Sequence, residues 1–144
     1  MHGRGRKGDP ILQPATIDGG TDENDTIAYL DRWIDVHMLG PNLGEAKSNL
    51  KFLLDTGKKL PINYVDIAWA KPVSEDVVSY EILDLGIPTG IITPQKRGAS
   101  SLGTWVVKSG RTTGVTHGRI SAVDVEIFIG YPIGVALFLD CVAV

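Results

Sequence analysis

The stretch AVDVEIFIGYPIGVALFLDCVAV, residues 122–144, decides the fold class. The apolar residues at 123, 125, 127 and 129 alternate with Asp124 and Glu126, which is the pattern of a strand with one buried face. Gly130, Pro132 and Gly134 then predict a turn. The apolar run from residue 135 to residue 144 predicts a second strand. This order of strand, turn and strand favours a mainly β protein.

Upstream of this stretch, turn signals divide the chain into short pieces. Residues 105–108 predict a short strand, and residues 109–114, SGRTTG, predict a turn-rich connection. The prolines and glycines of residues 72–103 predict connecting chain, with at most short strands near residues 77–83 and 90–93.

The first half of the chain contains one clear helix pattern. Apolar residues recur every three or four positions over residues 43–58, and Gly57 is placed to end the helix. Residues 26–38 are rich in aromatic and β-branched side chains, which favours a bulged strand over the alternative of a helix with apolar positions at 27, 30, 34 and 38. Residues 62–70 form an apolar run that contains one acid and predicts a further strand.

The composition excludes several classes of protein. The chain has 144 residues, a formal net charge of −3 and a single cysteine. One cysteine cannot form an internal disulfide or a cysteine-based zinc site, and no apolar run reaches the ~18 residues that a membrane span needs. The basic start is too short to indicate nucleic-acid binding. We therefore expect no cofactor, no nucleic-acid partner and no membrane partner.

The clustered acids of residues 18–25 do not predict a metal site. They lack the alternate spacing, central glycine and late glutamate of a helix–loop–helix calcium loop, so a solvated loop is favoured and no metal is expected. No secretory signal is recognisable, which weakly favours a cytoplasmic location.

Asp66 is the side chain that the pattern singles out. A strand of period two puts Tyr64, Asp66 and Ala68 on one face, opposite Val65 and Ile67. A carboxylate within an apolar run is unfavourable to bury unless it is paired. An exposed strand acid or a local cap is the favoured interpretation from these residues alone.

The other reactive side chains do not form a recognisable catalytic set. The histidines at 2, 37 and 117 are expected at the surface, and Cys141 is expected as an inert thiol within a strand. No serine lies in a Gly-x-Ser-x-Gly or Gly-Asp-Ser-Gly segment.

Three segments follow one another along the chain: GDPILQP with DGG (residues 8–14 and 18–20), NYVDIA (63–68) and KSGRTTGVT with GRI (108–116 and 118–120). Together they resemble bacterial trypsin-like serine peptidases. The first resembles the segment after the strand of the catalytic His, the second the Asn-x-Val-Asp-x-Ala segment of the catalytic Asp, and the third the Ser-Gly-Arg-Thr-Thr-Gly motif that opens the second barrel.

The resemblance implies a partial chymotrypsin-like double β-barrel with one inserted helix near residues 43–58. Residues 1–71 would be the remainder of the first barrel, residues 72–103 the inter-barrel connection and residues 104–144 the opening strands of the second barrel. Asp66 matches the catalytic Asp. The motif from Ser109 to Gly114 is expected as a structural turn, made of Ser109, Gly110, Arg111, Thr112, Thr113 and Gly114.

The resemblance supplies one member of the Ser-His-Asp triad. The segments that carry the His and the Ser in the family have no counterpart in these residues, so we expect a truncated peptidase domain that is inactive alone. A protein or peptide would be the substrate of a full-length parent.

Two alternatives remain open. One is a non-catalytic peptidase-like interaction or assembly module, which could form homo-oligomers through exposed strand edges. The other is an unrelated β-rich or α+β domain in which the motif matches are accidental.

Overall fold

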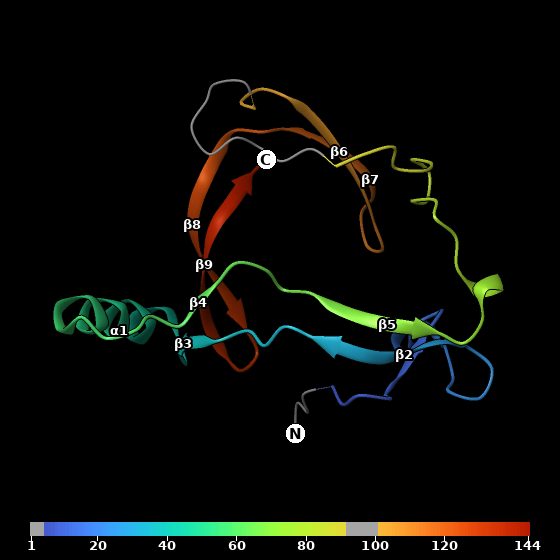
Figure 1. Ribbon diagram of the computed structural model, residues 1–144, viewed down its shortest axis with the longest axis horizontal. Coiled ribbons are helices and arrows are strands. Elements are labelled where there is room, and N and C mark those ends of the chain that lie inside the picture. The colour runs from blue at the N-terminus through green and yellow to red at the C-terminus, as the bar shows by residue number, and fades with distance from the viewer. Residues whose placement is uncertain (1–4, 92–100) are drawn as a thin grey trace. The chain divides into compact units, whose positions relative to one another are not determined.

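The computed structural model describes residues 5–91 and 101–144, which form two compact units (Figure 1). The first unit comprises Met1–Asp35 and Asp66–Ser79, and the second comprises Val36–Val65 and Tyr80–Val144. Within the described residues the fold is mainly β with one α-helix, as the sequence predicts.

The elements of the first unit are three strands and two short 3-10 helices: β1 (Pro10–Leu12), η1 (Thr16–Asp18), β2 (Thr26–Trp33), β5 (Ala68–Pro72) and η2 (Glu75–Val77). Those of the second unit are six strands and the α-helix: β3 (Met38–Gly40), α1 (Leu43–Thr56), β4 (Ile62–Asn63), β6 (Trp105–Gly110), β7 (Gly114–Arg119), β8 (Ala122–Tyr131) and β9 (Gly134–Ala143).

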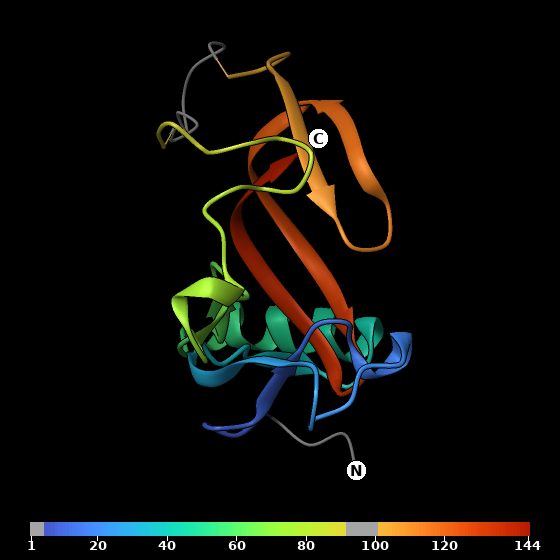
Figure 2. The same cartoon turned by 90° about the vertical axis from the view of Figure 1, so that its right-hand side faces the viewer.

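The strands β8 and β9 form the long antiparallel hairpin that the sequence predicts (Figure 2). Tyr131 pairs with Gly134 across the turn. The pairing shifts register twice, and Asp124 (φ 58°) and Asp140 (φ 59°) lie at these irregularities with left-handed backbone. The simple alternation along residues 123–129 is therefore interrupted by a bulge.

The strand β9 is the centre of the second unit. It pairs with β8 along one edge, and along the other edge with β3 in antiparallel and β4 in parallel orientation. Its first five residues, 134–138, are buried. The core of the second unit forms where this buried end meets the helix.

The helix α1 confirms the prediction for residues 43–58, ending two residues earlier. The side chain of its N-cap residue Asn42 accepts a hydrogen bond from the Glu45 backbone amide at Oδ1 (3.0 Å), and its Nδ2 donates to the Glu45 carboxylate (2.8 Å). Gly57 ends the helix in the left-handed conformation that glycine adopts without strain (φ 65°). The helix buries Ala46 against Leu39, Val135 and Leu137.

The sheet of the first unit has the order β1-β2-β5. Residues 26–38 do not form one helix or one strand: β2 ends at Trp33, and β3 begins at Met38 in the second unit. The helical alternative is therefore wrong, and the strand prediction holds for residues 26–33.

Two of the strands predicted from the sequence are not present as predicted. The run 62–70 is divided into β4 and β5, with residues 64–67 between them. Residues 77–83 form no strand but include the end of η2 and one side of an isolated bridge between Ile82 and Gly86. Residues 92 and 93 of the other predicted short strand lie outside the described residues.

The described strands form sheets of three, four and two strands, and none of these closes into a barrel. The assignment of residues 1–71, 72–103 and 104–144 to parts of a double barrel stays a prediction.

A candidate catalytic carboxylate and a hairpin motif

Asp66 lies in the segment between β4 and β5 and is exposed. The backbone beside it is anchored to the end of β2, because the Ile34 amide donates to the Ile67 carbonyl (3.0 Å) and Trp33 pairs with Ala68. The carboxylate is therefore carried on a short segment that leads directly into a paired strand.

The neighbours of Asp66 do not form the buried face that a continuous strand would have. Val65, Ile67 and Trp69 are 45%, 42% and 43% exposed. The expected division into a buried and an exposed face fails here, because residues 64–67 are not part of a ladder that would impose a period of two.

Asn63 begins the segment that contains Asp66, and the sequence pattern alone assigns it no role. Its side chain is buried, with 4% of the residue exposed. Its Oδ1 accepts from the His37 amide (2.8 Å), and its Nδ2 donates to the carbonyls of His37 and Leu137 (both 3.0 Å). A polar residue near the start of the apolar run 62–70 is the sequence signal for this contact.

The motif of residues 109–114 forms the tip of the β6–β7 hairpin. Ser109 and Gly110 belong to β6, residues 111–113 make the turn, and Gly114 begins β7 with a left-handed φ of 59°. The Lys108 ammonium donates to Thr113 Oγ1 across the turn (2.7 Å). The turn is shorter than predicted: it covers residues 111–113, because Ser109 and Gly110 continue β6 and pair with the start of β7. The family role of these residues stays a prediction.

The histidines and the cysteine take separate positions. His37 lies in the segment before β3, and His117 lies exposed in β7. His2 is outside the described residues. Cys141 is half-buried in β9, with its sulfur 3.8 Å from the Leu139 carbonyl.

The acidic residues 18–25 form a locally bonded loop. The Asp25 carboxylate accepts from the Thr21 amide (2.8 Å), and the Thr26 hydroxyl donates to the Asp22 carbonyl (2.8 Å). Across residues 5–91 and 101–144, no group of three or more His, Cys, Asp or Glu side chains is arranged to hold a metal ion.

Asp31 is the carboxyl group of the first unit whose pKa is shifted from its usual value. The Lys7 ammonium donates to Asp31 Oδ1 (2.7 Å), and this hydrogen bond together with the positive charge lowers the pKa of Asp31 below its usual value. The pair is at the surface, so it is open to screening by salt.

Comparison with protein-family models, with curated proteins and with solved structures gives no match. In the part of the chain that the structure describes, no helix is long and apolar enough to cross a membrane.

Proposed function

We propose that this sequence is the central part of a trypsin-like serine peptidase domain and that Asp66 is its orienting carboxylate. The proposal rests on the order of the three motif segments along the chain. The observation that supports it is the anchored backbone of Asp66, which lies on a short segment tied to β2 and leading into β5. A carboxylate that orients a histidine needs a fixed backbone, because its position sets the orientation of the imidazole ring.

In this mechanism Asp66 accepts a hydrogen bond from one imidazole N–H. That bond fixes the tautomer, so the other ring nitrogen takes the proton of the nucleophilic serine, and the carboxylate stabilises the imidazolium that results. The His and the Ser would come from segments outside these 144 residues. The chain alone would then lack the nucleophile, the base and the oxyanion-hole amides.

The test begins with the coding sequence on both sides of this segment. We expect a His-bearing segment upstream and a Gly-Asp-Ser-Gly segment downstream. In the longer polypeptide, Asp66→Asn should lower kcat/KM for a peptide substrate by about 10⁴-fold, because the histidine is then held in the wrong tautomer. Asp76→Asn, which changes an exposed acid of η2, is the matched control and should leave kcat/KM unchanged.

Three results would contradict the proposal. The flanking segments could lack the His or the Ser, or Asp66→Asn could retain activity within a few fold of the parent enzyme. The 144-residue chain could also cleave peptides by itself and react with a serine-directed fluorophosphonate probe, although it is expected to do neither.

A second candidate function is a non-catalytic assembly module. One observation favours it: Tyr29, Trp33 and Trp69 expose large aromatic surfaces on the paired strands β2 and β5. Among the described residues β5 pairs with β2 alone, which leaves one of its edges open to another strand.

A further inference from the structure

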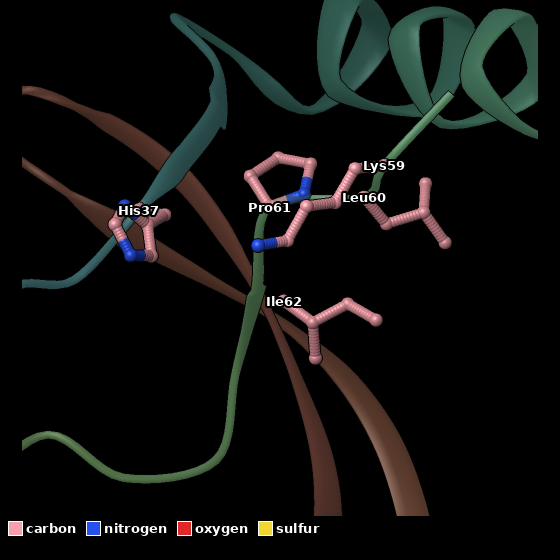
Figure 3. Close-up of a pocket in the computed structure, with 5 residues that line it drawn as sticks. All are labelled: His37, Lys59, Leu60, Pro61 and Ile62. Carbon is pink, nitrogen blue, oxygen red and sulfur yellow. The ribbon is translucent and has the colours of Figure 1, made fainter.

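A small hollow in the second unit lies between the segment before β3 and the loop that joins α1 to β4 (Figure 3). It has a volume of about 300 Å³ and is lined by His37, Lys59, Leu60, Pro61 and Ile62. Figure 3 shows the Lys59 side chain directed past Pro61 toward the side on which His37 lies. None of these five residues carries a carboxylate, so the hollow combines an aliphatic lining with nitrogen donors.

The walls of the hollow are held by hydrogen bonds. The two backbone groups of His37 are bound by the buried Asn63 side chain. On the opposite wall, the Ile62 amide donates to the Leu60 carbonyl (3.1 Å). The residue before this wall, Lys58, is fixed as well, since its backbone amide donates to the Leu53 carbonyl (3.1 Å). A site whose backbone is already ordered loses little conformational freedom when a ligand binds.

We propose that this hollow binds the carboxylate of a small aliphatic acid. The Lys59 ammonium pairs with one carboxylate oxygen, and an imidazole N–H of His37 donates to the other. The hydrocarbon part of the acid covers Leu60, Pro61 and Ile62. The volume is at the lower end of the range for small-molecule sites, about 300–1,000 Å³, which limits the ligand to a small one.

A carboxylate fits this lining better than two other chemistries. A neutral aliphatic molecule would make no use of the positive charge of Lys59. A phosphate has no hydrocarbon part to cover Leu60, Pro61 and Ile62. The same carboxylate could belong to a free acid or to the C-terminal residue of a peptide, and the probes below separate these two sources.

The test is a titration of the ¹⁵N-labelled chain at pH 7, followed by the amide shifts of His37, Lys59, Leu60 and Ile62. The probes are hexanoate for a free acid, N-acetylleucine for a peptide C-terminus, N-acetylleucinamide as its neutral match, and inorganic phosphate. We expect saturable shifts with a Kd of about 1–10 mM for hexanoate, N-acetylleucine or both. The neutral amide and phosphate should bind at least about ten-fold more weakly.

Variants assign the binding to the two donors. Lys59→Gln and His37→Gln should each weaken the binding of the acid by about three- to ten-fold. Lys58→Gln is the matched control, since the Lys58 ammonium lies over the Phe52 ring (5.2 Å) and outside the hollow, and it should leave the Kd unchanged. The amide spectrum of each variant shows whether its fold is retained.

Saturable binding that shifts the amides of residues 37, 59, 60 and 62 and depends on Lys59 supports the site. The proposal is overturned if no probe gives saturable shifts or if phosphate or the amide binds as tightly as the acids. It is also overturned if Lys58→Gln weakens binding as much as Lys59→Gln, which would indicate a general attraction of anions to the two lysines.

Discussion

Asn63 shows how one buried polar side chain joins distant segments of the second unit. Its three hydrogen bonds reach the segment before β3 and the middle of β9, and the bond to Leu137 spans 74 residues of chain. Burial of an amide is tolerated here because both of its ends are bonded. Removal of the side chain would leave backbone groups of His37 and Leu137 without these partners.

We therefore expect Asn63→Ala to lower the free energy of unfolding by about 2–3 kcal/mol, because buried backbone groups lose their partners. Urea denaturation followed by circular dichroism measures this change. Asn24→Ala is the control and should cost less than about 0.5 kcal/mol, since Asn24 is exposed and makes one long bond to Thr21 Oγ1 (3.5 Å). Equal effects of the two substitutions would contradict the role assigned to Asn63.

The pKa of Asp31 gives a second prediction at the scale of a residue. Lys7→Gln should raise this pKa toward its usual value, because the hydrogen bond and the charge of Lys7 are the main causes that lower it. Lys51→Gln, which removes the partner of Asp55 (2.6 Å), should leave Asp31 unchanged. A titration of the Asp31 side-chain carbon by NMR measures both effects, and an unchanged pKa in Lys7→Gln would exclude the pairing.

This shift also sets the sign of a pH effect on stability. The folded state favours the ionised form of Asp31. Asp31 therefore stabilises the fold at pH values above the pKa that its carboxyl group has in the unfolded chain. This stabilisation is lost as the pH falls through the lowered pKa of Asp31 in the folded state. The exposed position of the pair keeps it small and sensitive to salt.

At the scale of elements, the packing of β3 against α1 depends on Gly40. A Cβ built on Gly40 would lie 2.7 Å from the Ala46 amide nitrogen and 3.0 Å from the Ala46 Cα, both of which belong to the helix backbone. A backbone atom cannot rotate away as a long side chain can. The strand would have to move from the helix, which would loosen the core around Leu39 and Ala46.

Gly40→Ala should thus destabilise the chain by about 1–3 kcal/mol, the usual effect of forcing an extra methyl group into a packed contact. Thermal unfolding compared with that of Gly90→Ala measures the effect. A Cβ at Gly90 would meet nothing within 4 Å, so this control should stay within about 0.5 kcal/mol of the parent. A Gly40→Ala variant as stable as the parent would mean that β3 and α1 are less closely packed than the structure shows.

At the scale of the whole molecule, much apolar surface is left in contact with solvent. Tyr29, Trp33, Ile34, Ile67 and Trp69 of the first unit are all exposed, and Ala28 is the buried hydrophobic residue there among those described. Exposed apolar surface together with an open strand edge favours association between chains.

We expect the 144-residue chain to associate with itself, with a sedimentation coefficient that rises over about a hundred-fold range of concentration. Trp69→Lys places a charge on the open strand β5 and should reduce this association. Tyr80→Lys, at an aromatic residue that lies outside the strands and is more exposed than Trp69, is the control and should have little effect. A chain that stays monomeric throughout would contradict the expectation and remove the support for an assembly module.

Local patterns of the sequence determined the elements that depend on nearby residues. The helix at residues 43–56, the hairpin of β8 and β9 and the turn at residues 111–113 all follow from periodicity and turn chemistry, because their hydrogen bonds join residues close along the chain. The mainly β class follows from the same patterns. The peptidase role of Asp66 came from motif resemblance and stays a proposal.

The tertiary structure alone decided the features that depend on distant residues. The break of the run 62–70 into β4 and β5 arises because β4 pairs with β9 in the second unit while β5 pairs with β2 in the first. The same holds for the buried Asn63 and for the hollow beside His37 and Lys59. Periodicity reports which side chains share a face, but it carries no information on which distant strand will supply the partner.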